Sequence, residues 1–283
     1  MAQDSSTANF KLADGHGYML DRSHIAACRL NLQHFLWKEV FQFSIHPAIQ
    51  LPVDRPVHIA DVAAGTGLWL IDVARELPAA QLDGLDIDLT QAPHPRWLPP
   101  NITLRQWNIF EDVPSDLVGK YDLVHVRLLV LVLSALDPKP VIRNLLQLVK
   151  HGGYLQWDEL DCVNMHVKKV DPSVRAPALE ELCKMSYSDG RHDWVLDLPQ
   201  LLMQEGFHDA QLEYYGDKPE LVRAFNDQHL LTMDEFAAGL MRINKQEAAA
   251  KFYQLIRDGY QECVDGAAFC IPRVVIVAKK PNN

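Results

Sequence analysis

The sequence has no long apolar run and no cluster of basic residues. Its most apolar stretch, residues 123–136, contains His125 and Arg127 and is shorter than the roughly 20 apolar residues that a membrane-spanning helix needs. The formal net charge is -10, and no Lys/Arg-rich run offers a counter-surface for phosphates. We therefore expect neither a membrane span nor a nucleic-acid partner.

Cysteine is also scarce, with five residues in 283. They are scattered, form no C-x-x-C pair and lack metal-ligand spacing to histidine, so reduced thiols and no metal site are expected. The first ten residues are polar, with neither the basic start nor the apolar core of a signal peptide. These absences predict a cytoplasmic protein that binds small molecules, as a monomer or a weak dimer.

The pattern that is present alternates short apolar runs with helical ones. Apolar runs occur at residues 57–62, 82–87, 102–108, 123–126, 154–157, 210–215 and 271–278. Strands buried on both faces read in this way when helices connect them by right-handed crossovers. The sequence therefore predicts a doubly wound, Rossmann-like α/β fold with a seven-stranded, mostly parallel sheet.

The flanks of this pattern are helical. We expect residues 1–50 to form an N-terminal lid, residues 51–283 the main domain, and residues 217–265 a helical cap inserted before the last strand. The lid helix is predicted to bury its apolar face and to expose Arg22, Arg29, Gln33 and Trp37. That apolar face comprises Ile25, Cys28, Leu32, Phe35, Leu36 and Val40.

A glycine-containing turn follows the first strand, in the segment Asp61-Val-Ala-Ala-Gly65-Thr-Gly67. Open α/β sheets bind nucleotide-like ligands at such a turn, where glycine lets the backbone approach the ligand closely. Leu70 stands where a dinucleotide fingerprint needs its third glycine, and the lysine of a P-loop is missing. The turn therefore favours a ligand without a diphosphate, whose cationic end can face Asp61.

Two further strand ends add polar residues. Asp86 lies 19 residues beyond Gly67, near the offset at which an acidic side chain binds a ribose. Asn108 and Ile109 end the next strand with an amide and an apolar neighbour that suit an adenine. S-adenosylmethionine (SAM) combines a cationic end, a ribose and an adenine without phosphate, so we predict it as the ligand.

These motifs resemble, in order, the motif series of class I SAM-dependent methyltransferases. The series consists of Asp61-x-x-x-Gly65-x-Gly67, Gly84-Leu-Asp86, Asn108-Ile109, Tyr121-Asp-Leu-Val-His-Val-Arg127 and His151-Gly-Gly-Tyr-Leu. The flanks at residues 18–22, 29–34 and 271–277 resemble the branch of that family found in fungal secondary metabolism. Within that branch, the chain is similar to the thiol methyltransferases of gliotoxin-type metabolites.

The resemblance implies that SAM lies across the carboxyl ends of the strands and leaves as S-adenosylhomocysteine. The glycines would adjoin the methionine moiety, and residues of the lid would close the site. The implied cofactor-binding residues are Tyr18, Arg22, Asp61, Ala63, Gly65, Gly67, Asp86, Ile87, Asn108, Ile109 and Arg127. Ala63 stands where the family usually has glycine.

The acceptor pocket is less well marked, and no catalytic residue is singled out. Its candidates are His24, Arg127, Trp157, Asp158, His192 and Trp194, whereas His125 is expected to pack in the sheet. The SAM methyl group is already electrophilic, so positioning is the main catalytic requirement. A thiol needs less help from a base than an alcohol does, and no Asp/His pair has a fixed spacing. S-methylation of a small natural product is therefore expected.

Other functions remain open. An O- or N-methyltransferase of secondary metabolism would use the same fold and cofactor. A pericyclase or a regulatory protein could bind SAM without transferring its methyl group. A nicotinamide-dependent reductase is disfavoured by the turn and would be stabilised by NADPH instead of SAM.

Overall fold

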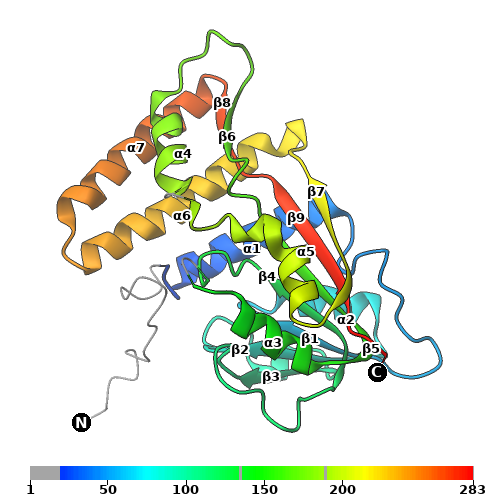
Figure 1. Ribbon diagram of the computed structural model, residues 1–283. Helices are drawn as coiled ribbons and strands as arrows, with labels where there is room; N and C mark the ends of the chain where they lie inside the picture. Colours follow the sequence, from blue (N-terminus) through cyan, green and yellow to red (C-terminus); the bar gives the residue numbers. More distant parts are fainter. Residues whose placement is uncertain (1–19, 134–135, 188–189, 283) are drawn as a thin grey trace, which may run out of the picture.

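A seven-stranded sheet forms the centre of the computed structural model, which describes residues 20–133, 136–187 and 190–282. The strand order is β3-β2-β1-β4-β5-β9-β7, and only β9 runs against its neighbours (Figure 1). The strands are β1 (His58–Val62), β2 (Gln81–Asp86), β3 (Ile102–Gln106), β4 (Tyr121–Arg127), β5 (Val149–Leu160), β7 (His208–Tyr215) and β9 (Arg273–Lys279). The predicted fold class is confirmed: the sheet is seven-stranded, mostly parallel and doubly wound.

Helices cover both faces of the sheet because neighbouring residues of each strand point to opposite sides. Ala60 and Val124 contribute to the core beneath α3 (Lys139–Leu148) and α5 (Trp194–Gln204). Ile59 and Leu123 pack under α2 (Leu68–Glu76) on the other face. Within the described part of the chain, no helix is long and apolar enough to cross a membrane.

The order in which strands are added to the sheet reverses at β1. From β1 it moves outward through β2 to β3, and it then returns to pair β4 with the other side of β1. The connections after β1 and β4 therefore diverge and leave a crevice at the carboxyl ends of these strands.

A helical cap stands to one side of the sheet (Figure 1). It contains α4 (Pro177–Tyr187), α6 (Val222–Arg242), α7 (Gln246–Val264) and the strand pair β6 (His166–Lys169) and β8 (Ala267–Cys270). Leu179, Leu182, Met233 and Phe269 share its apolar core. The predicted insertion covers α6 and α7 but not α4 and β6. Because β6 pairs with a strand about a hundred residues away, its membership in the cap leaves no local pattern.

The orientation of α1 (His24–Phe41) contradicts the prediction. Ile25 and Phe35 are 52% and 56% exposed, and Cys28 and Leu32 are exposed with them. Arg29, Gln33 and Trp37, which were expected in solvent, are buried, and of the predicted apolar face only Leu36 and Val40 are buried. The inward face of α1 combines apolar residues with charged groups, and these groups find buried partners: Arg29 pairs with Glu235 and His34 with Asp72.

The turn after β1 passes three times through the left-handed backbone region. Gly65 and Gly67 adopt φ values of 54° and 70°, and Ala63 adopts 59°. The backbone N–H of Ala63 donates to the carbonyl of Leu85 at 2.7 Å, which ties the turn to β2. A residue with a Cβ is strained in this conformation by about 1 kcal/mol, so the turn forms at a cost that glycine would avoid.

We predict that Ala63→Gly increases the free energy of unfolding by about 0.5 kcal/mol, because the relief of strain exceeds the added flexibility of the unfolded chain. Urea denaturation monitored by circular dichroism measures the change. Ala64→Gly is the matched control: Ala64 is not in the left-handed region, so this variant should lose stability. Equal losses in both variants would contradict the prediction.

Candidate functional site

A cavity of about 650 Å³ opens at the carboxyl ends of β1, β2 and β4 and continues beneath α1 and α6 into the cap. This volume lies within the range of about 300–1,000 Å³ that is common for ligand pockets. One wall is formed by the strand ends. The opposite chamber is apolar and is lined by Met165, Met233, Phe236, Phe252 and Phe269. The cavity therefore joins a polar wall to an apolar chamber.

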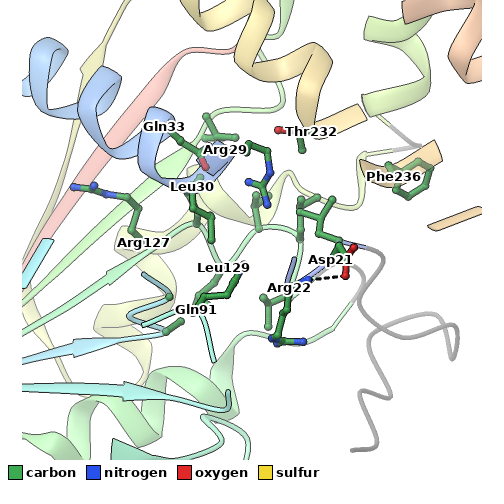
Figure 2. Close-up of a pocket in the computed structure, with 18 of the residues that line it drawn as sticks. Asp21, Arg22, Arg29, Leu30, Gln33, Gln91, Arg127, Leu129, Thr232 and Phe236 are labelled. Atoms are coloured by element: carbon green, nitrogen blue, oxygen red, sulfur yellow. Dashed lines mark hydrogen bonds between the residues drawn. The ribbon is translucent and has the colours of Figure 1, made fainter. Parts of the chain in front are cut away.

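Most of the residues predicted to bind a cofactor come together on the polar wall. The cavity is lined by Arg22, Asp61, Ala63, Gly65, Asp86, Ile87, Asn108, Ile109 and Arg127. Figure 2 shows Arg22 and Arg127 on different sides of the pocket, with Leu129 between them. Gly67 is the N-cap residue of α2 and does not line the cavity, and Tyr18 falls outside the described residues.

Only some of the residues predicted for the acceptor pocket line the cavity. Arg127 and His192 line the cavity, but His24, Trp157, Asp158 and Trp194 do not. His24 is exposed at the start of α1. Trp157 and Trp194 pack edge-to-face, 5.8 Å apart, in the core beneath α5. Position at the end of β5 suggested Trp157 and Asp158, but the alternation of side chains along the strand turns Trp157 away from the ligand.

Asp86 connects the end of β2 to the glycine turn. Its carboxylate accepts hydrogen bonds from the backbone N–H of Gly65 at 2.8 Å and of Asp88 at 3.0 Å. Burial raises the pKa of Asp86, although these two donors favour the charged form. Arg22 forms an ion pair with Asp88 at 3.3 Å, so a cation from the lid adjoins this acidic corner of the cavity.

Asn108 has a local role as well as a place in the cavity wall. Its Oδ1 accepts a hydrogen bond from the backbone N–H of Phe110 at 3.1 Å, which stabilises the turn after β3. The structural role and the ligand-binding role are compatible, because an amide carries two donors and a second lone pair. Ile109 lies beside it, buried in the core, and gives this corner an apolar surface.

A chain of buried charges lies beneath the polar wall. His125 contacts Asp61 Oδ1 through Nδ1 at 2.7 Å and Asp158 Oδ2 through Nε2 at 3.0 Å. Arg127 donates to the same Asp158 oxygen at 2.7 Å, and Trp69 stacks on the imidazole at 3.9 Å. Negative and positive groups therefore alternate from Asp61 to Arg127.

His125 must be an imidazolium in this arrangement, because ionised carboxylates only accept hydrogen bonds and both ring nitrogens face one. Burial opposes the charge, but Asp158 and Asp61 raise the pKa of His125 above its ordinary value. Burial likewise opposes ionisation of Asp158, yet Arg127 and His125 lower its pKa to about 2. Asp61 uses Oδ1 for His125, so Oδ2 is its oxygen for a cationic ligand.

His125 was expected only to pack in the sheet; it is buried there, and it also connects two carboxylates. The sequence holds a partial signal, because Asp61 pairs with His125 and Arg127 pairs with Asp158 in neighbouring strands. Strand register is needed to read that signal.

The roof of the cavity was missed by sequence reasoning. Arg29 of α1 donates to Glu235 of α6 at 2.6 Å, and both side chains are nearly inaccessible. Gln33 from α1 and Thr232 from α6 line the same roof, and Figure 2 shows them beside Arg29. No motif could have indicated this group, because its two helices are about two hundred residues apart in the chain.

The chain resembles curated methyltransferases, and no family model matches it. It is 39% identical over 175 residues to "Methyltransferase grgD" of Penicillium sp, covering 56% of this chain and 60% of that protein. The predicted resemblance to fungal methyltransferases is confirmed. It is also 34% identical to "N-methyltransferase tcpN" of Claviceps purpurea (46% and 47% covered) and 30% identical to "N-methyltransferase gliN" of Aspergillus fumigatus (51% and 50% covered). The chain thus spans about half the length of the curated relatives it matches.

Solved structures align more distantly. The [4+2]-cyclase SpnF is 19% identical, with 91% of this chain and 82% of that chain covered and a TM-score of 0.45. This degree of likeness bears on neither activity nor ligand.

We predict that His125→Gln lowers the free energy of unfolding by about 3 kcal/mol, because it leaves two buried carboxylates without their shared cation. The loss should be largest below pH 6.5, where the histidine is protonated in both the folded and the unfolded chain. As the pH rises from 6.5 through the raised pKa, the unfolded chain loses the proton first and the advantage of the wild type shrinks.

Urea denaturation of both proteins between pH 5 and 9 measures this difference. His151→Gln is the control, since His151 is exposed and should change stability little at any pH. A difference between wild type and His125→Gln that grows with pH would show that His125 is neutral when buried.

Proposed function

We propose that this protein is a SAM-dependent methyltransferase that acts on a small molecule. The observation that carries the proposal is a cavity that joins a polar wall at the sheet switch point to an apolar chamber in the cap. A methyl transfer needs both compartments in contact, because the acceptor atom must reach the methyl group in line. The similarity to fungal methyltransferases supports the same function.

The polar wall matches the parts of SAM. Asp61, held by His125, would face the cationic methionine end, and the turn at Gly65 would adjoin it. Asp86 would accept hydrogen bonds from the ribose hydroxyls, and Asn108 with Ile109 would contact the adenine. SAM supplies an electrophilic methyl group when bound. The protein has to bind it, orient it and exclude water.

Two elements, nitrogen and sulfur, are candidates for the atom that accepts the methyl group. Four relatives, tcpN, gliN, verN and sirN, are named N-methyltransferases, so nitrogen is the acceptor that the relatives favour, and the thiol expected from the sequence is the second candidate. His229 lines the chamber, but burial and the nearby Arg273 lower its pKa to about 3, which makes it a poor base at neutral pH. Catalysis by positioning suits nitrogen or sulfur better than an unactivated alcohol.

We predict that Asp86→Asn weakens SAM binding at least tenfold, because a carboxylate accepts stronger hydrogen bonds than an amide does. Isothermal titration calorimetry with SAM measures the dissociation constant. Asp83→Asn is the matched control on the same strand: Asp83 contacts Lys120 and Tyr121 instead of the cavity. Equal affinities in the two variants would remove Asp86 from the site.

Methyl transfer itself is tested by incubating the protein with methyl-labelled SAM and a panel of amines, thiols and phenols. We expect labelled product with an amine or a thiol, together with S-adenosylhomocysteine. Tight SAM binding without transfer to any class would favour a non-methylating pericyclase or a regulatory protein of the same fold. Thermal stabilisation by NADPH but not by SAM would indicate a reductase.

A further inference from the structure

Two buried polar atoms of α6 have no hydrogen-bond partner among the described residues: Gln228 Oε1 and His229 Nε2. Gln228 is 0% exposed and His229 is 4% exposed, and both residues line the cavity. A buried polar atom without a partner costs free energy, so such atoms are rare unless something binds them. These two atoms belong to neither the polar wall nor the predicted site.

The orientation of the Gln228 amide is settled by Thr232, one helical turn later. Thr232 Oγ1 donates its single proton to the backbone carbonyl of Gln228 at 3.1 Å. It can therefore only accept from the amide, and Gln228 Nε2 donates to it at 3.0 Å. Gln228 Oε1 is consequently an acceptor with a fixed direction, and only an N–H or O–H group can satisfy it.

His229 is held beside it as a neutral ring. The imidazole packs against Phe225 and Phe269, with ring centroids 6.3 Å and 5.6 Å away. Its low pKa, caused first by burial and then by Arg273, keeps it uncharged. A neutral imidazole donates or accepts one hydrogen bond at Nε2 according to its tautomer, so His229 can serve a second polar atom of the same ligand.

The surroundings of this pair are apolar. Met165, Met233, Phe252 and Ile271 line the chamber with Phe269, and the ion pair of Arg29 and Glu235 is already complete in itself. A charged ligand group would lose its hydration here, and the two atoms of α6 without partners, Gln228 Oε1 and His229 Nε2, belong to neutral side chains. A neutral N–H or O–H on an apolar body suits the chamber.

We infer that Gln228 and His229 are the specificity-determining residues for the acceptor. The acceptor is a neutral, mainly apolar molecule that donates an N–H or O–H to Gln228 Oε1 and places a second polar atom at His229 Nε2. This inference rests on the proposed function, because a molecule bound in the chamber is a methyl acceptor only if SAM occupies the polar wall.

The test uses indole and 1-methylindole, which share the same ring system, but 1-methylindole has an N-methyl group in place of the N–H donor. Their dissociation constants are measured by ligand-observed NMR with protein saturated with S-adenosylhomocysteine. Wild type should bind indole about tenfold more tightly, the value of one buried hydrogen bond. In Gln228→Met, which preserves the volume of the side chain, the preference should disappear.

Two control measurements distinguish the loss of the Gln228 contact from a loss of folding. Gln228→Met should not lower the melting temperature of the free protein, because removal of a buried acceptor without a partner offsets the lost hydrogen bond to Thr232. Met233→Leu, in the same chamber, should change the binding of both probes equally and keep the preference for indole. Equal binding of the probes by wild type, or a preference that survives Gln228→Met, would overturn the inference.

His229 is tested with 2-oxindole, which keeps the N–H and has a carbonyl on the neighbouring ring carbon. His229→Phe preserves the ring packing but removes Nε2, and it should weaken 2-oxindole severalfold more than indole. An equal effect on the two probes would remove His229 from the site. Calorimetry with S-adenosylhomocysteine on the same samples separates the two proposals: if that ligand fails to bind, the proposed function fails, while the probe comparison on the free protein still tests Gln228.

Discussion

The buried alternation of charges from Asp61 through His125 and Asp158 to Arg127 connects three neighbouring strands of the sheet. β1, β4 and β5 each contribute to it, and the polar wall of the cavity rests on it. Four charges can be buried together only because each meets its opposite at hydrogen-bond distance. The network therefore fixes the direction of the Asp61 carboxylate before any ligand arrives, which is the kind of preorganisation that binding and catalysis use.

The two parts of the cavity are formed by different elements of the fold, the sheet and the helical cap. The polar wall is formed by strand ends and by the strained turn at Ala63, where the backbone is fixed by its neighbours. The apolar chamber is formed by the cap, whose helices come from distant parts of the chain. Under the proposed function, this division would let the sheet keep its cofactor site while the cap sets the choice of the acceptor.

Much of the fold and part of the site could be predicted because the signals are local. Seven apolar runs mark the strands. Asp61 and Asp86 lie at the carboxyl ends of β1 and β2, Asn108 follows β3, and these ends meet at one edge of the sheet. The prediction for α1 failed because periodicity reports which residues share a face, but not which face is inside. Partners such as Glu235 for Arg29 lie far away in the chain, and they reverse the expected burial.

The sheet, the glycine turn and the order of the polar strand ends follow from the local sequence, because each depends on neighbouring residues and on the rules of parallel-strand connection. Tertiary contacts place His125 between two carboxylates and bury Arg29 and Gln33 of α1. They also leave Gln228 Oε1 without a partner among the described residues. These features depend on strand register and on helix packing between distant segments, and neither leaves a local pattern in the chain.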